Sequence, residues 1–485
     1  MQLTTAATAS ARHDVPGPRG HPVLGNTLGF KNDIIGTLMA GFRDYGDIVK
    51  FRGVGPLFPI YLFAHPDYAM HALKDNAENY PRTPLVRSKW HMVVGDGLIC
   101  IEGDFWRSQR KLAQPSFDPK LLQSFDALIA EETEAMLERW DGFAERGEPL
   151  DIAREMTHLA LANLGGAMFS TGWRQEALVM ADAVEFTIGY AYMLLTQPVV
   201  LPENVPTPAN RRFKEARRTL EQIMERMIAR RHSVDEQPKD LLGTLMAARD
   251  AETGEGLSDY QVRSHLMTFM FGGHETVAVG LAWTWWLLSK HPEVLRKLEA
   301  EVDEKLNGEL PNFENTRQLE YLTRVINESL RIRPPVWLMS RMPTEDDEVG
   351  GYHIPAGSQI LISSYVSHHH TDFWDNPEGF DPDRWLPERV AERPKHAWFP
   401  FSGGPHQCIG GYFGLMEMQI VISMILQRLE LDVVPGHVVE AKPGITLGFK
   451  HGLLMRVRKR QPKRNGDAYV AEGAAAGATA RAAPS

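Results

Sequence analysis

A lone cysteine, Cys408, follows a glycine-rich loop and precedes an apolar segment, Gly411–Leu429, that we expect to be helical. The loop reads Phe401-Ser-Gly-Gly-Pro-His-Gln-Cys-Ile-Gly410. A thiolate in front of a helix is stabilised by the positive end of the helix dipole and by free backbone N–H groups. Gly404 and Gly410 have no side chain, so a flat cofactor could approach the backbone there. The pattern favours a thiolate metal ligand, although an isolated cysteine is more often a small buried residue.

A second pattern, Gly272-Gly-His-Glu-Thr276, interrupts a long apolar segment. Gly272 and Thr276 are four residues apart, so they share one face of a helix. Glycine inside a helix costs about 1 kcal/mol relative to alanine, which calls for a compensating role. One interpretation is room for a small ligand beside a cofactor, with the Thr276 hydroxyl as donor and Glu275 linked to a proton path. The alternative is tight helix packing at the glycines, with Thr276 bonded to its own helix.

A third pattern places Glu328 and Arg331 three residues apart, so that their side chains can meet on one helix face. A second arginine, Arg384, lies downstream in the proline-punctuated segment Phe380-Asp-Pro-Asp-Arg-Trp385. A carboxylate that bridges two arginines would clamp this loop to the helix. We therefore expect these residues to hold the cofactor loop rather than to perform chemistry.

The elements that must position these residues are mostly helical. Periodicity predicts helices through 118–250, one continuous helix over 259–290 that ends at His291-Pro292, and another from 292 to 306. Pro334-Pro335 ends a further helix. Short strands are expected at 48–52 and 58–64 (as a hairpin), 351–354, 359–363 and 452–458. The pattern predicts one mainly α domain with a minor β portion.

Composition excludes several classes of protein. The 485 residues contain 52 basic and 62 acidic side chains, a net charge of -10, which argues against a nucleic-acid binder. Two cysteines exclude a disulfide framework and fit a reducing compartment. We expect residues 1–15 to be a disordered lead, 16–460 to be the folded domain, and the small-residue tail 461–485 to be disordered.

The sequence predicts neither an N-terminal membrane anchor nor a membrane-spanning segment. The first residues lack the apolar stretch of a signal peptide. The apolar run 266–288 contains His274 and Glu275, and a bilayer would penalise a charge there. We therefore expect a helix through the core of a cytoplasmic protein, with His274 as a packed or hydrogen-bonded core residue.

Taken together and in this order, the three patterns resemble the cytochrome P450 superfamily of haem-thiolate monooxygenases, from about Pro16 to Arg460. The resemblance implies a triangular helical prism that holds haem b between the central helix and the helix after the cysteine. It makes Cys408 the axial iron ligand and places Phe401, Gly404 and Gly410 in the cofactor-binding loop. A thiolate ligand pushes electron density onto haem iron and favours O–O cleavage.

The resemblance also assigns roles to the other patterns. Gly272 matches the oxygen-binding groove, and Glu275 and Thr276 match the acid–alcohol pair of the central helix. Three residues match the structural triad of the family, namely Glu328, Arg331 and Arg384.

Four further residues match the groups that hold the haem propionates. These are Trp106 and Arg110, which are four residues apart, together with Arg341 and His406. The chain departs from the family pattern at two of the matched positions, since His406 stands where arginine is usual and Gly272 where alanine is usual. The run His368-His-His370 suggests a metal site, but His368 matches a histidine common in that segment, so we do not favour metal binding there.

The implied function is hydroxylation or epoxidation of a hydrophobic small molecule such as a fatty acid, terpenoid or polyketide. It would use O₂ and electrons from a separate ferredoxin or flavodoxin with an NAD(P)H reductase, and the chain would be a monomer. Lys395, Arg107 and Lys111 are candidate contacts for the redox partner. The resemblance implies a hydrophobic pocket lined by the segment after Arg82 and by residues near 186–206, 267–271, 336–339 and 445–449. The segments 201–212 and 445–458 look more like those of members that act on fatty acids or similar lipids.

Two alternatives keep the haem. One is a peroxide-dependent or isomerase-type haem-thiolate enzyme, which the retained Glu275-Thr276 pair disfavours. The other is a non-catalytic haem-thiolate sensor or carrier, which needs no oxygen groove.

Overall fold

The computed structural model describes residues 14–53, 59–170, 173, 176–196, 201–234 and 238–460. Residues 1–13 of the expected lead and the expected tail 461–485 lie outside the described residues. Within the lead, Asp14 is exposed, whereas Val15 is 8% exposed and packs into a core cluster with Ile48. The domain limits given above otherwise remain a prediction.

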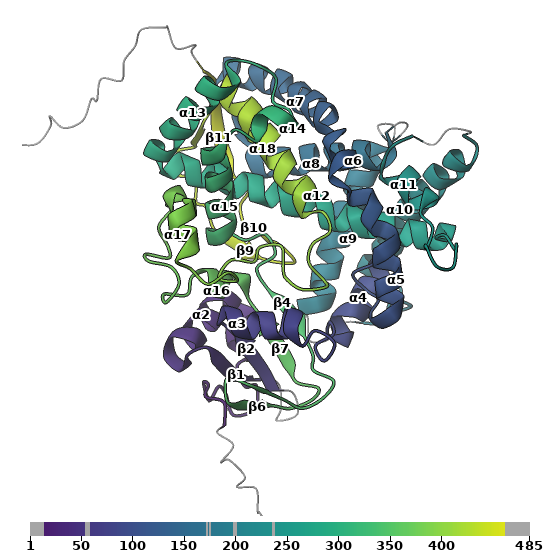
Figure 1. Ribbon diagram of the computed structural model, residues 1–485, viewed down its shortest axis with the longest axis vertical. Coiled ribbons are helices and arrows are strands. Elements are labelled where there is room, and N and C mark those ends of the chain that lie inside the picture. Colours follow the sequence, from purple (N-terminus) through teal and green to yellow (C-terminus); the bar gives the residue numbers. More distant parts are fainter. Residues whose placement is uncertain are drawn as a thin grey trace, which may run out of the picture.

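Helices dominate the described chain and form one large body, with a small sheet at one end (Figure 1). The shorter helices are α1 (Thr27–Asn32), α2 (Ile34–Tyr45), α3 (Pro66–Met70), α4 (Pro84–Val94), α5 (Gly103–Ala113), α6 (Pro119–Gln123), α11 (Leu241–Ala247), α14 (Phe313–Thr316), α16 (Ser364–His368) and α17 (Pro387–Ala391). The longer ones are α7 (Asp126–Arg146), α8 (Ile152–Phe169), α9 (Ala177–Thr196), α10 (Pro208–His232), α12 (Asp259–Lys290), α13 (Pro292–Leu306), α15 (Glu320–Ile332) and α18 (Gly411–Arg428). The mainly helical class expected from the sequence is confirmed.

The central helix α12 has the predicted limits, because strong local signals mark both of its ends. Ser258 caps its N-terminus in a reciprocal pair with Gln261, which satisfies two otherwise free backbone N–H groups. The helix ends where Pro292 starts α13. Most of its side chains are buried, and α8 is its principal neighbour. His274 is 2% exposed and its Nδ1 lies 2.6 Å from the Met270 carbonyl oxygen, as expected of a core residue.

Helix α18, which follows the cysteine loop, packs against α7, α13, α15 and α12. Its contact with α12 is close, because a Cβ added at Gly414 would lie 3.3 Å from Val277. One turn further on, Gly280 of α12 meets Met418. From these contacts the two segments run back toward Gly272 and Cys408, so α12 and the cysteine loop flank the same region.

Four small sheets accompany the helices in the described residues. The largest has the order β1-β2-β7-β4, with β1 (Ile48–Arg52) antiparallel to β2 (Pro59–Phe63), β2 parallel to β7 (Gln359–Ile362), and β7 antiparallel to β4 (Met339–Arg341). The others join β3 (Pro149–Asp151), β11 (Leu454–Lys459) and β8 (Leu429–Val433); β5 (Asp347–Val349) and β6 (Tyr352–Ile354); and β9 (Ala441–Pro443) and β10 (Leu447–Phe449).

The expected hairpin at 48–64 is present, although Phe58 lies outside the described residues. Strand β3 interrupts the stretch predicted to be helical throughout, because Pro149 starts an extended segment that pairs with β11 more than three hundred residues later. Strand β8 begins at Leu429, the last residue of the expected apolar helix.

Candidate active site

The cysteine loop is a tight turn closed on itself. The backbone N–H of Cys408 donates to the carbonyl oxygen of Phe401 at 3.0 Å, and that of Gln407 donates to Gly404 at 3.1 Å. Gly404 has φ of +67°, and a Cβ there would lie 2.0 Å from the carbonyl oxygen of Leu73. The lack of a side chain at Gly404 therefore lets the segment 71–75 pack closely against the loop. The sequence had led us to expect a cofactor at this place.

Cys408 is exposed in this structure. Arg110 and the backbone N–H groups of Gly410 and Gly411 nevertheless lie close enough to affect the ionisation of its thiol. Burial raises the pKa of the Cys408 thiol, while the backbone N–H groups of Gly410 and Gly411 and the charge of Arg110 act to lower it. A cation bound at the sulfur would supply the stabilisation that the thiolate lacks here.

The two adjacent glycines of α12 have opposite surroundings. A Cβ at Gly273 would lie 2.9 Å from Leu164 of α8, so this glycine allows close helix packing. A Cβ at Gly272 would meet no atom within 4 Å, and Gly272 is exposed although α12 is otherwise largely buried. Of the two alternatives that the sequence left open, close packing applies to Gly273, and Gly272 has the open space that the ligand interpretation requires.

The side chains of Glu275 and Thr276 are turned to different partners. The Thr276 hydroxyl donates to the Gly272 carbonyl oxygen at 2.9 Å, which is the bond to its own helix considered above. Glu275 Oε1 accepts a hydrogen bond from the Thr446 hydroxyl at 2.8 Å. Burial raises the pKa of Glu275, and the bond from Thr446 and the charge of Lys442 oppose that rise. Thr446 was not among the residues that the sequence indicated.

Three arginines lie close enough together to influence each other's protonation. Arg82 forms an isolated β-bridge with Arg341, and both lower the pKa of His406, as does Arg110. One carboxylate, Glu102, lies 3.0 Å from Arg82 Nη1. Burial lowers the pKa of Arg341 to about 9, so this guanidinium is still charged at neutral pH. The cluster therefore carries more positive than negative charge.

His406 lies inside this cluster as a neutral ring. Burial, followed by the charges of the three arginines, lowers its pKa to about 2. Its Nε2 lies 3.4 Å from Glu102 Oε2, a contact that is not a charge pair because the ring is unprotonated. Its ring stacks on that of Trp106 at a centroid distance of 4.1 Å. Its Nδ1 is buried and has no hydrogen-bond partner among the described residues.

These features fit the haem expected from the sequence. The carboxylate of Glu102 offsets one arginine and leaves two cations uncompensated, which suits a cofactor with two propionate groups. The orphaned His406 Nδ1 is a donor or acceptor without a partner, and Gly272 and Cys408 both face open space. The residues that would hold the group are Cys408 at the iron and Arg110, Arg341, Trp106 and His406 at the propionates.

Arg82 and Glu102 were missed as site residues. Their signal in the sequence is weak, because they are twenty residues apart and lie just before two different helices, Arg82 before α4 and Glu102 before α5. The backbone N–H of Arg82 also donates to Glu102 Oε1 at 3.1 Å, so the carboxylate fixes both the backbone and the guanidinium. No motif spacing encodes this pair.

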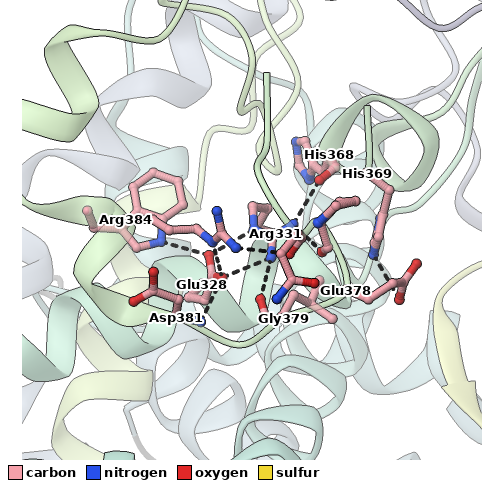
Figure 2. Close-up of polar contacts among 12 residues, drawn as sticks. Glu328, Arg331, His368, His369, Glu378, Gly379, Asp381 and Arg384 are labelled. Atoms are coloured by element: carbon pink, nitrogen blue, oxygen red, sulfur yellow. Dashed lines mark hydrogen bonds and ion pairs between the residues drawn. The ribbon is translucent and has the colours of Figure 1, made fainter. Parts of the chain in front are cut away.

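The predicted carboxylate bridge is a buried network (Figure 2). Glu328 accepts bonds from Arg331 Nε and Nη2, each at 2.8 Å, and Arg384 Nε lies 3.2 Å from Glu328 Oε1. The side chains of Glu328 and Arg331 are fully buried, and Arg384 is nearly so. The backbone N–H of Asp381 and the indole of Trp385 also donate to Glu328, both at 3.1 Å.

Arg331 extends the network toward the cysteine loop. It donates to the carbonyl oxygens of His368 at 2.9 Å, Pro377 at 2.7 Å and Gly379 at 3.0 Å. His368 Nε2 then accepts the backbone N–H of Phe399, two residues before the loop, at 3.0 Å. The network thus connects α15 to the segment that carries Cys408.

The other histidines of the run have protein partners. His369 Nδ1 lies 2.7 Å from the Tyr365 carbonyl oxygen, and His370 Nε2 lies 2.9 Å from Asp47 Oδ1. In the described residues no group of three metal-ligating side chains is assembled.

All three candidate partner-docking cations, Lys395, Arg107 and Lys111, are exposed, and two of them have ion-pair partners among the described residues. Arg107 lies 3.3 Å from Glu78 and 3.4 Å from Asp104. Lys111 lies 3.3 Å from Asp250 and 3.8 Å from Glu252. A groove beside them is lined by Trp106, Arg107, Arg110, Lys111, Gln114, Pro115, Phe117, Asp118 and Pro119. Any docking partner would have to compete with these carboxylates.

Within the described residues, no helix combines the length and apolarity required to span a bilayer.

Comparison with known proteins places the chain among well-described relatives. A family model described as cytochrome P450 matches residues 15–458. Cyclooctatin synthase of Streptomyces melanosporofaciens is 35% identical over 443 residues, which cover 91% of this chain and 95% of the relative. Cyclooctat-9-en-7-ol 5-monooxygenase of the same organism is 35% identical, covering 89% and 94%. The crystal structure of a cytochrome P450DA haem domain matches with a TM-score of 0.84 and 25% identity, covering 93% of this chain and 99% of that chain.

Proposed function

Because the chain belongs to the cytochrome P450 family, we propose that Cys408 holds a haem b in a monooxygenase that acts on a neutral, hydrophobic ring compound. The family implies a haem-thiolate cofactor and the use of O₂ with a redox partner. When bound, the haem supplies the O₂-activating iron, and the thiolate favours cleavage of the O–O bond. The observation that carries the proposal is the exposed Cys408 beside Arg110, a member of a cluster with surplus positive charge.

The residues of this chain have separate tasks in that reaction. Arg110 and Arg341 bind the propionates, and the His406–Trp106 stack fills the space beside them. Gly272 leaves room on α12 for a diatomic ligand. The Thr276 hydroxyl leaves its bond to Gly272 to donate at the oxygen site, and Glu275 resupplies the proton.

The substrate class rests on the relatives and on the pocket segments. One relative oxidises, by its name, position 5 of the unsaturated alcohol cyclooctat-9-en-7-ol. The segments implied to line the pocket contribute buried apolar side chains, and the rings of Trp90 and Phe271 lie 6.4 Å apart. A neutral ring alkene or alcohol suits such a surface, since it needs no cation to pair with a carboxylate. Fatty acids, which the sequence favoured, become the second class to test.

The experiment is a binding screen followed by turnover. Purified haem protein is titrated with neutral ring alkenes and alcohols and with fatty acids, and the spin-state change of the haem is recorded. Hits are incubated with isotopically labelled O₂, a ferredoxin and its reductase. We expect one labelled oxygen atom in the product of a ring compound. Product formed only with peroxide, without label from O₂, would contradict the proposal in favour of the peroxide-dependent alternative.

The redox partner is proposed to be a separate acidic ferredoxin with an NAD(P)H reductase, with a flavodoxin as the second choice. Arg107 and Lys111 of α5 border the groove beside Arg110, on the helix that also carries Trp106. Opposite charge on the partner would steer its approach to this helix. We further propose that the chain acts as a monomer in the cytoplasm.

A further inference from the structure

The turn between β9 and β10 brings one hydroxyl group to Glu275 of the central helix. Thr446, 4% exposed, lies in this turn and is 171 residues away from Glu275 in sequence. Its hydroxyl donates to Glu275 Oε1 at 2.8 Å, which leaves Oε2 without this bond. The contact is buried enough that loss of the donor would leave a carboxylate poorly solvated.

The turn keeps its shape by bonds that do not use the Thr446 hydroxyl. The indole of Trp337 donates to the Gly444 carbonyl oxygen at 3.0 Å, and that of Trp283 donates to Leu447 at 2.6 Å. The backbone N–H of Leu447 donates to Pro335 at 2.9 Å. Because the turn is fixed from α12 and from the segment after α15, the hydroxyl is presented to Glu275 at a set position.

A third element also holds the turn. The Tyr192 hydroxyl of α9 donates to the Pro443 carbonyl oxygen at 2.7 Å. Phe449 stacks on Trp283 of α12, with ring centroids 4.0 Å apart. Rigid support of this kind is what a group needs if it is to hold another side chain in one geometry.

We propose that Thr446 is a positioning residue, which holds one carboxylate oxygen of Glu275 against the β9–β10 turn and leaves the other free for proton transfer. The inference rests on the proposed function for its catalytic consequence. The bond to Thr446 and the charge of Lys442 oppose the rise in the pKa of Glu275 caused by burial. Without the hydroxyl, Glu275 would hold its proton to higher pH and its carboxyl group would rotate freely.

The test compares Thr446→Val, which keeps the shape, with Thr446→Ser, which keeps the hydroxyl. Thr157→Val is the matched control, because Thr157 is a half-buried threonine on α8 whose hydroxyl bonds to Ala153 of its own helix. The first readout is the carboxyl stretching band of Glu275 in the infrared spectrum of the haem protein. It is assigned by its loss in Glu275→Gln, and it requires no turnover.

We expect Thr446→Val to raise the pH midpoint of that band by about 1 to 2 pH units, since a hydrogen bond to a charged group has this effect on ionisation. Thr446→Ser should restore the midpoint, and Thr157→Val should leave it unchanged. The second readout is the product formed per electron consumed, which should fall several-fold in Thr446→Val and show a larger solvent deuterium isotope effect.

An unchanged infrared midpoint in Thr446→Val would overturn the positioning role, whatever the enzyme does. If Thr446→Val does not fold, Thr446→Ala is measured in its place with the same expectation. If no substrate gives product, the proposed function fails, while the infrared titration still decides whether Thr446 controls Glu275.

Discussion

The ring of His406 lies on the ring of Trp106, with a centroid distance of 4.1 Å and an angle of 6° between their planes. This stack places a neutral imidazole where the family usually has a guanidinium. The charges of Arg82, Arg341 and Arg110 around it, together with burial, lower the pKa of His406 and keep the ring neutral. The histidine noted in the sequence therefore contributes no charge here, and the cations that Glu102 leaves uncompensated are Arg110 and Arg341.

Replacement of Arg110 by Gln should weaken haem retention. The change removes one of the two uncompensated guanidinium groups, and a hydrogen bond to a charged group is worth about 1.5–3 kcal/mol. Haem loss to an excess of an apo-globin acceptor should then be about 10- to 100-fold faster. Arg107→Gln, three residues earlier on α5 and exposed, is the control and should match the unmodified protein. Equal loss rates for both variants would contradict the assignment.

Replacement of Glu328 by Gln should strongly destabilise the protein. The variant leaves Arg331 and Arg384 buried without their carboxylate, which costs about 3–5 kcal/mol. Urea unfolding of both proteins measures the difference. Glu320→Gln on the same helix is exposed and should change the free energy of unfolding by less than about 0.5 kcal/mol. A loss below about 1 kcal/mol in Glu328→Gln would show that the network is not a stabilising clamp.

Glu417 predicts a pH dependence of stability. Burial on α18 raises its pKa to about 8, against the bond from Asn163 at 2.9 Å. Above pH 4.5 the unfolded chain loses this proton and the folded protein keeps it until about pH 8. The contribution of Glu417 to the free energy of unfolding is therefore greatest below pH 4.5. It falls as the pH rises to about 8, by at most about 1.4 kcal/mol per pH unit.

The Glu417→Gln variant should lack this slope. Its amide is neutral in both states and can also donate to Asn163 Oδ1, which has no partner in the described residues. We expect the difference in unfolding free energy, variant minus unmodified protein, to increase steadily from pH 5 to pH 8. Glu138→Gln, an exposed change on α7, should show no such gain. Parallel curves for all three proteins would disprove the buried, protonated state of Glu417.

Charge reversal at Arg107 and Lys111 together should slow reduction by an acidic ferredoxin. The expected decrease is about 10-fold at low salt and should vanish at high salt, because screening shortens the reach of the charges. Trapping of the reduced haem with carbon monoxide in a stopped-flow experiment measures the rate. Arg211→Glu, an exposed change on α10, is the control. A rate that is unaffected at all ionic strengths would exclude this face as the docking surface.

The sequence predicted the elements whose signals are local. Ser258 with Gln261, and Pro292 after His291, define the limits of α12 within the chain itself. The carboxylate bridge was also accessible, because Glu328 and Arg331 lie on one helix turn. Strand β3 was not predicted, because it has only three residues and pairs with the distant strand β11.

The rest of the site depends on contacts between distant segments. Arg82 pairs with Glu102 across twenty residues, and Thr446 meets Glu275 across 171. Gly272 and Gly273 look alike in the sequence and differ only in what faces them, open space for one and Leu164 for the other. Such distinctions come from packing, which residue spacing does not encode.

The most direct test of the central claim is the absorption spectrum of the dithionite-reduced haem protein under carbon monoxide, compared with that of Cys408→His. We predict a strongly red-shifted Soret band for the unmodified protein and its loss in the variant, because thiolate donation from Cys408 produces the shift. A Soret band without the shift in the unmodified protein, or an identical band in both proteins, would contradict the assignment of Cys408 as the iron ligand.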